Sequence, residues 1–118
     1  MEPGEAIMAF SQSEKIKSGL IWASQAVEIS NNIAGHEKQG AEKIIISLIG
    51  MILHEVQLAM NVAGSAPWQD IEKDIERALV MINSGVGLES VPHLIQALSK
   101  TTTVGQNSMV RLQEEGLI

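Results

Sequence analysis

Apolar residues recur with helical spacing in four stretches of this sequence, and a glycine-containing break separates each stretch from the next. Within the stretches, apolar side chains return after three, four or seven residues, which is the repeat of one face of an α-helix. Valine, isoleucine and the few aromatic residues are not arranged in the alternating runs typical of strands. Because the breaks are short, successive helices should lie side by side and antiparallel. The sequence therefore predicts an all-α fold, an up-down antiparallel four-helix bundle.

Capping signals and glycines place the expected helices at residues 11–34, 37–63, 66–84 and 91–115. Ser11 and Glu14 have the spacing of a capping box, and Gly35 is a typical left-handed stop. Pro67 is tolerated in a first turn, and Ser90 is a favourable cap for the last helix. Residues 11–118 should form a single domain. Residues 1–10 are expected to add a helical turn or to form an arm that docks on a neighbour.

The composition restricts the classes of function. Of 118 residues, 45% are hydrophobic and only 19% are charged, below the usual quarter, so some apolar surface should remain exposed. The formal net charge is -6 and the basic residues are scattered, which argues against nucleic-acid binding. The absence of cysteine excludes disulfides and thiolate chemistry. The N-terminus lacks the pattern of a signal peptide, and His54 and Glu55 interrupt the apolar run 44–53 well below the length of a membrane span. We expect a cytoplasmic protein with no membrane partner.

The second expected helix carries a carboxylate among its apolar residues. At 100° per residue, its polar side chains fall into one narrow strip that should face solvent: Lys43, Ser47, Gly50, His54, Gln57 and Asn61. Glu55 lies outside this strip, among Leu48, Met51 and Leu58. An unpaired buried carboxylate costs several kcal/mol. Glu55 should therefore meet a donor or water at a seam of the bundle or of a subunit, bind a ligand or metal in a cavity, or act in acid–base chemistry.

No sequence motif supports the chemical alternatives. A di-iron bundle requires Glu-x-x-His pairs, and no glutamate here has a histidine three residues later. The residue four after His54 is Leu58, so the zinc motif H-E-x-x-H is also absent. Phosphate-binding glycine motifs are missing as well. We expect no catalytic residue, no metal and no cofactor.

The stretch 99–108 is a poor helix former by intrinsic propensity, because it contains three consecutive threonines, a valine and a glycine. Thr101, Gly105 and Ser108 would share one face of the last helix with Leu94 and Leu98. Small residues there could let this helix approach another closely. They could instead line a pocket that faces Glu55, or the helix could break.

The segment HEKQG, residues 36–40, resembles the His-x-x-Lys-Gly motif of histidine phosphotransfer domains, which are also four-helix bundles. The resemblance covers five residues, and Gln39 occupies the place of the lysine. It would imply a phosphate-accepting role for His36.

Apolar surface on the second and fourth helices exceeds what one bundle needs, which marks an association site. A symmetric homodimer is the commonest outcome, with a higher homo-oligomer as the alternative, and an unidentified protein partner could also bind. The predicted interface residues are Ile21, Leu48, Met51, Leu58, Leu94 and Leu98. The sequence favours a non-enzymatic, self-associating interaction protein. The alternative is a bundle that binds a small molecule or metal through Glu55 and the Thr101, Gly105, Ser108 wall.

Overall fold

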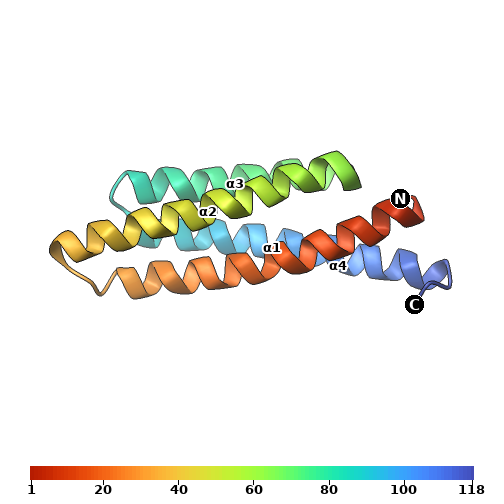
Figure 1. Cartoon of the computed structure of the whole chain (residues 1–118), viewed down its shortest axis with the longest axis horizontal. Helices are drawn as coiled ribbons and strands as arrows, with labels where there is room; N and C mark the ends of the chain where they lie inside the picture. Colours follow the sequence, from red (N-terminus) through yellow and green to blue (C-terminus); the bar gives the residue numbers. More distant parts are fainter.

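The computed structural model describes residues 1–118 and is an all-α bundle of four helices. The helices are α1 (Pro3–Ser30), α2 (Gly35–Ala63), α3 (Ala66–Asn83) and α4 (Ser90–Glu114), with a short 3₁₀ turn, η1 (Gly87–Glu89), before α4. They run up and down along a molecule of 54 × 21 × 18 Å (Figure 1). The predicted fold class is confirmed.

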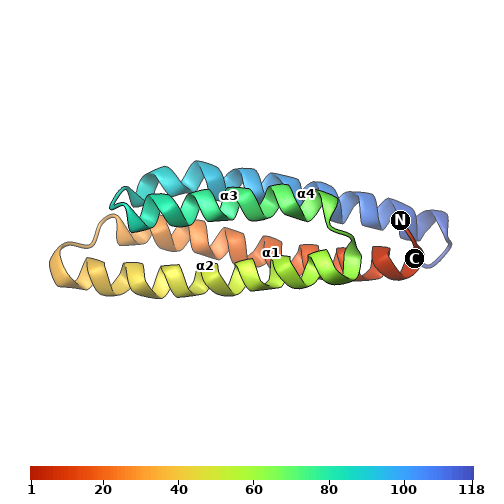
Figure 2. The same cartoon turned by 90° about the horizontal axis from the view of Figure 1, so that it is seen from above.

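Each helix occupies one corner of a four-cornered bundle. α1 packs against α2 and α4, and α3 packs against the same two helices. α2 and α4 lie diagonally opposite, and no two of their Cα atoms lie within 8 Å of each other. The N-terminal end of α1 and the C-terminal end of α4 project together beyond α2 and α3 (Figures 1 and 2). Side chains of two helices can therefore form a common outer surface only if the helices are neighbours, such as α1 and α2, and not if they are the diagonal pair α2 and α4.

α1 starts at Pro3 and not at Ser11, so of the two expectations for residues 1–10 the structure shows the additional helical segment and not the arm. Proline is compatible with the first helical turn, and Ala6 and Ala9 are buried, so tertiary packing extends the helix over residues 3–10. α1 also ends earlier than expected, at Ser30. Gly35 has a φ of 67° and forms the first residue of α2, where it turns the chain. The other predicted boundaries agree with the structure to within two residues.

The core is aliphatic, with Trp68 as its one fully buried aromatic side chain. α2 contributes a buried stripe at alternating steps of four and three residues, which is the repeat of a helix facing a bundle interior. We call this the inner α2 stripe, and it consists of Ile45, Ile49, Ile52, Val56, Ala59 and Ala63. α3 contributes Ile71, Ile75 and Ile82 to the same cluster.

The stretch 99–108 is continuous helix within α4, which removes the predicted alternative of a break. Small residues allow α1 and α4 to pack closely: a Cβ atom placed on Gly105 would lie 2.8 Å from Ser13 Oγ. Thr101 and Ser108 are buried, and their hydroxyls donate to the backbone oxygens of Ala97 and Val104, each at 2.7 Å. The prediction that small residues serve a close helix approach is confirmed.

Candidate interaction surface

A second apolar stripe runs along α2 next to the inner stripe and faces outward. It has the same alternating steps of four and three residues, and Glu55 is its one polar member. We call it the outer α2 stripe: Ile44, Leu48, Met51, Glu55, Leu58 and Val62. Ile44 is 72% exposed and Met51 is 61% exposed. α2 therefore uses only part of its apolar circumference in the bundle.

α1 carries a matching column on the side that adjoins α2. Met8, Lys15, Trp22 and Ile29 follow each other at steps of seven residues, and both Trp22 and Ile29 are 64% exposed. Trp22 borders a shallow hollow together with Leu48 and Met51. A second hollow, lined by Ile29 and Ile44 among others, lies further along the same seam. The outer α2 stripe and this column form one surface, which we call the α1–α2 face.

Glu55 is tied to α1 in the middle of the α1–α2 face. Gln12 Nε2 donates to both Glu55 Oε2 and the Glu55 backbone oxygen, each at 3.0 Å. Lys15 Nζ lies 3.3 Å from the same Oε2 atom. The Gln12 hydrogen bond, with a smaller contribution from Lys15, lowers the pKa of Glu55 against the opposing effect of desolvation. Glu55 is thus an ionised carboxylate at the α1–α2 seam, with its side chain 28% exposed.

The polar strip predicted for the second helix is exposed along its whole length. Lys43, Ser47, Gly50, His54, Gln57 and Asn61 all lie on the outside of α2. His54 and Glu55 therefore point in different directions, as the helical wheel predicts, and the strip borders the outer α2 stripe.

The six residues predicted as an interface do not lie on one surface. Leu48, Met51 and Leu58 lie together on the α1–α2 face. Ile21 is on another side of α1, Leu98 is half-buried against the core, and Leu94 is fully buried within it. Leu94 is therefore unable to contact another molecule, and its assignment to an interface is wrong. Because α2 and α4 lie diagonally opposite, a continuous surface formed by these two helices is also excluded.

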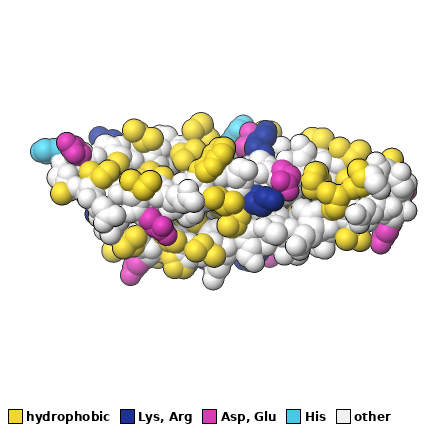
Figure 3. Space-filling model, turned by 90° about the horizontal axis from the view of Figure 1, so that it is seen from below, with side chains coloured by type: hydrophobic (Ala, Val, Ile, Leu, Met, Phe, Trp, Pro, Cys, Tyr) yellow, Lys and Arg dark blue, Asp and Glu magenta, His cyan; other side chains and the backbone are white.

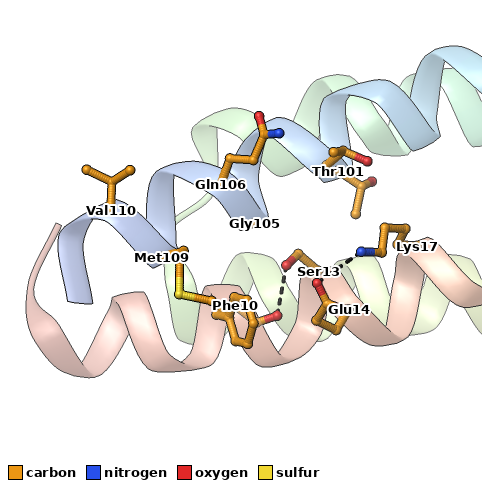
Figure 4. Close-up of a pocket in the computed structure, with 10 residues that line it drawn as sticks. Phe10, Ser13, Glu14, Lys17, Thr101, Gly105, Gln106, Met109 and Val110 are labelled. Carbon is orange, nitrogen blue, oxygen red and sulfur yellow. Dashed lines mark hydrogen bonds and ion pairs between the residues drawn. The ribbon is translucent and has the colours of Figure 1, made fainter. Parts of the chain in front are cut away.

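The predicted pocket between Glu55 and the small residues of the last helix is not formed. Thr101 and Gly105 line a different hollow, of about 410 Å³, between α1 and α4 (Figure 4). Phe10 and Met109 lie side by side at one end of it, and Lys17 lies at the other end, paired with Glu14 at 3.1 Å. Ser108 does not line this hollow, and Glu55 belongs to α2, which lies diagonally opposite α4.

This α1–α4 side differs from the α1–α2 face. In the view from below, its hydrophobic side chains form separate groups with polar surface and charged side chains between them (Figure 3). Ile7 and Ile21 of α1 are exposed there, but Glu14 lies midway between them in the heptad column.

Sequence reasoning missed the one ionisable side chain that is fully buried, Asp74 of α3. Its carboxylate lies 2.7 Å from Lys100 Nζ of α4 and 3.3 Å from Arg77 of α3. Asp74 looks like one of several acids near a helix start. The signal that could have revealed it is its position between Ile71 and Ala78, at helical steps within the apolar stripe.

α2 as a whole is long and apolar enough to cross a bilayer, judged by length and composition alone. Contrary to the expectation from the sequence, the interruption by His54 and Glu55 does not remove this property. A core helix of a bundle has the same composition, and 28% of the relevant stretch of α2 is buried in this one.

No group of three or more histidine, cysteine, aspartate or glutamate side chains is placed to hold a metal ion. His36 is exposed in the first turn of α2. Searches against protein-family models, curated proteins and solved structures found no match to this chain. What the protein does must therefore be inferred from its own surface and contacts.

Proposed function

We propose that this chain is a non-enzymatic interaction protein of the cytoplasm that works as a homodimer, held together through the α1–α2 face. The observation that carries the proposal is the concentration of exposed large apolar side chains on this one side, among them Trp22, Ile29, Ile44 and Met51. Contiguous apolar surface of this kind marks association sites, whereas scattered apolar residues do not. Tryptophan and methionine are also enriched in interfaces.

The size of the face is sufficient for a specific contact. Residues 44–62 span about 27 Å at the rise of an α-helix. Two helices packed side by side present a surface about 20 Å wide. One copy therefore offers on the order of 500 Å², and two copies would bury about 1,000 Å², the lower limit for a specific interface.

The alternative function, ligand or metal binding within the bundle, has less support. Glu55 is engaged by Gln12 and Lys15 at the surface seam and does not point into an interior cavity. The volume of the hollow between α1 and α4 falls in the range of small-molecule sites, which favours a ligand-binding role. Glu55, however, is not among the residues that line this hollow.

The test compares two equally exposed apolar side chains. Met51, 61% exposed, lies on the α1–α2 face, and Val80, 58% exposed, lies on α3 outside it. Sedimentation velocity at micromolar concentration should show a dimer for the wild type and for Val80→Lys, and a monomer for Met51→Lys. A lysine at the centre of the face would be desolvated, and Glu55, the carboxylate of this face, is already paired with Lys15. A monomeric wild type would refute the proposal.

A second measurement separates self-association from membrane binding, which α2 would permit by composition. The purified protein should stay in the soluble fraction when centrifuged with vesicles of neutral or anionic phospholipid. Co-sedimentation that Met51→Lys abolishes would assign the same face to a bilayer and contradict the dimer.

A further inference from the structure

We propose that the two copies are related by a two-fold axis parallel to the helices, so that α1 of one copy lies on α2 of the other, and that Lys15 and Glu55 select this arrangement. This inference rests on the proposed homodimer and specifies its geometry. The two α1–α2 faces would then pack against each other and form the core of an intermolecular four-helix bundle, with α1 and α2 from each copy.

Along the α1–α2 face, each residue of the α1 column has a chemically complementary residue of α2 at the same height, or level, along the bundle axis. Lys15 lies at the level of Glu55, as their 3.3 Å contact shows. Seven residues further along α1 and seven back along α2, Trp22 lies beside Leu48. Seven residues in the other direction, the same antiparallel register places Met8 at the level of Val62. Each level therefore pairs an apolar residue of α1 with an apolar residue of α2, or a cation with an anion.

A two-fold axis parallel to the helices keeps every residue at its level and exchanges α1 with α2. Apolar side chains of one copy then meet apolar side chains of the partner, and Lys15 of each copy meets Glu55 of the other. A two-fold axis across the helices would instead place α1 on α1. At the level of the pair it sets Lys15 against Lys15 and Glu55 against Glu55, and at the neighbouring levels it sets both ions against apolar side chains. Opposed like charges in an interface work against association. The charged pair therefore discriminates between the two orientations.

The pair also has unused hydrogen-bonding capacity that a second copy fits. Both protein donors to the Glu55 side chain use Oε2, and Oε1 accepts no hydrogen bond within the chain. The Lys15 ammonium group makes one of its three hydrogen bonds, and its side chain is 58% exposed. In the dimer, each Lys15 can donate to the free Oε1 of the partner, which closes a ring of four charges. Such a ring satisfies both ions when the apolar levels around them exclude water.

Electrostatics favours a second copy at this surface in spite of the net charge of -6. The α1–α2 face contains one cation and one anion and is neutral as a whole. On its α1 side it is bordered by uncharged residues at steps of seven, Ser11, Ser18, Gln25 and Asn32. On its α2 side the polar strip contains Lys43 and His54 but no acid. Two acidic chains can therefore approach here without opposing negative charges.

Charge reversal tests the selection of the partner. K15E alone and E55K alone would each place four like charges in the homodimer, and each dissociation constant should rise by about 100-fold or more. An equimolar mixture of the two variants should form heterodimers with wild-type affinity, because cations of one chain then face anions of the other. The double variant K15E/E55K should recover the homodimer. Native mass spectrometry distinguishes these species, and circular dichroism of each single variant confirms that the monomer is folded.

The outcomes separate this inference from the proposed function. If K15E and E55K remain dimeric while Met51→Lys is monomeric, the face mediates association but the charged pair does not select its partner, and the inference is overturned. The inference also fails if the single variants dissociate but their mixture does not form heterodimers. A monomeric wild type would refute the proposed function itself.

Cross-linking tests the direction of the axis. The chain has no cysteine, so only introduced thiols can react. Ala26 and Ile44 line the same hollow and lie at the same level. A mixture of chains carrying Ala26→Cys with chains carrying Ile44→Cys should form disulfide-linked dimers on oxidation. A mixture of Ala26→Cys with Gly4→Cys chains is the control, because those positions would meet only with an axis across the helices at the level of Lys15. Cross-linking of the control pair instead would overturn the inference.

Discussion

α2 and α3 are neighbouring helices with two packing partners each, but their outward surfaces differ. α3 buries one stripe that includes Trp68, Ile71 and Ile75, and its exterior carries charged residues such as Lys73 and Glu76. α2 buries an equally regular stripe and then exposes a second one beside it. The two adjacent columns of exposed apolar side chains are therefore specific to the α1–α2 side. The other helices also expose apolar residues, among them Val80 of α3 and Ile95 of α4.

The two exteriors imply different surroundings. A charged exterior such as that of α3 keeps a protein in solution and opposes adventitious contacts. The α1–α2 face has the heptad spacing and the aliphatic side chains of a helix-packing surface, with one charged pair in place of many. The comparison suggests that the exterior of α3 is suited to water and that the exterior of α2 is suited to another helix.

The largest expected effect is the difference in stability between a substitution in the inner α2 stripe and one in the outer α2 stripe. Ile49 of the inner stripe is fully buried, whereas Ile44 of the outer stripe is 72% exposed. Ile49→Ala should lower the free energy of unfolding of the monomer by about 2–5 kcal/mol, because it leaves a cavity in the core. Ile44→Ala should change it by less than about 0.5 kcal/mol. Urea denaturation at concentrations where the protein is monomeric measures both, and equal effects would mean that the stripes are not distinct.

This division within α2 was largely predictable. The helical wheel separates the polar strip with His54 from the apolar arc with Glu55, because 100° per residue places neighbours on different faces. The wheel does not reveal which part of a wide apolar arc the other helices cover. That depends on which corner each helix occupies, and the diagonal placement of α2 and α4 is a tertiary property. Leu94 was misassigned for this reason: an apolar residue on a wheel can face either the core or a partner.

The second expected effect compares a buried and an exposed carboxylate of α3. Asp74 of α3 is fully buried between Lys100 and Arg77, and Asp70, one turn earlier, is exposed. Asp74→Asn should destabilise the protein by about 1–3 kcal/mol, because an amide that replaces a paired carboxylate leaves buried polar atoms with weaker partners. Asp70→Asn is the matched control and should have little effect. Thermal unfolding of both variants provides the measurement, and equal melting temperatures would show that the buried pair contributes no stability.

The sequence predicts that Glu55 meets a donor at a seam of the bundle, and Gln12 of α1 is that donor, but the sequence does not reveal the buried carboxylate of Asp74. Glu55 lies in an apolar context in the sequence, but its longer side chain reaches the surface between α1 and α2. Asp74 lies in a charged segment, but its short side chain cannot extend past the α3–α4 contact to water. Burial follows from the contact between helices and from the length of the side chain, and neighbouring residues in the sequence give neither.

A smaller effect should distinguish the close α1–α4 contact from the exposed polar strip of α2. Gly105→Ala would place a methyl group 2.8 Å from Ser13 Oγ, which forces the helices apart or displaces the serine. The free energy of unfolding should fall by about 1–2 kcal/mol. A Cβ atom on Gly50 of α2 would meet no atom within 4 Å, so Gly50→Ala should instead be stabilising, by up to about 1 kcal/mol, through helix propensity. Opposite signs in chemical denaturation would establish the difference, and destabilisation by Gly50→Ala would contradict it.

The smallest expected effect concerns the protonation of Glu55. Its pKa is lowered from the ordinary value of 4.5, first by the hydrogen bond from Gln12 and then by Lys15. A lowered pKa in the folded state means that the ionised group stabilises the fold above pH 4.5 and that this contribution disappears as the pH falls through the lowered value. The difference in stability between the wild type and Glu55→Gln should therefore be constant near neutral pH and shrink only in acid. At dimer-forming concentrations this difference should be larger, because the partner's Lys15 would add to the stabilisation of the ionised form. If the stability difference between the wild type and Glu55→Gln does not depend on protein concentration, Glu55 interacts only within its own chain. The distinction between the exteriors of α2 and α3 would then rest on the apolar residues alone.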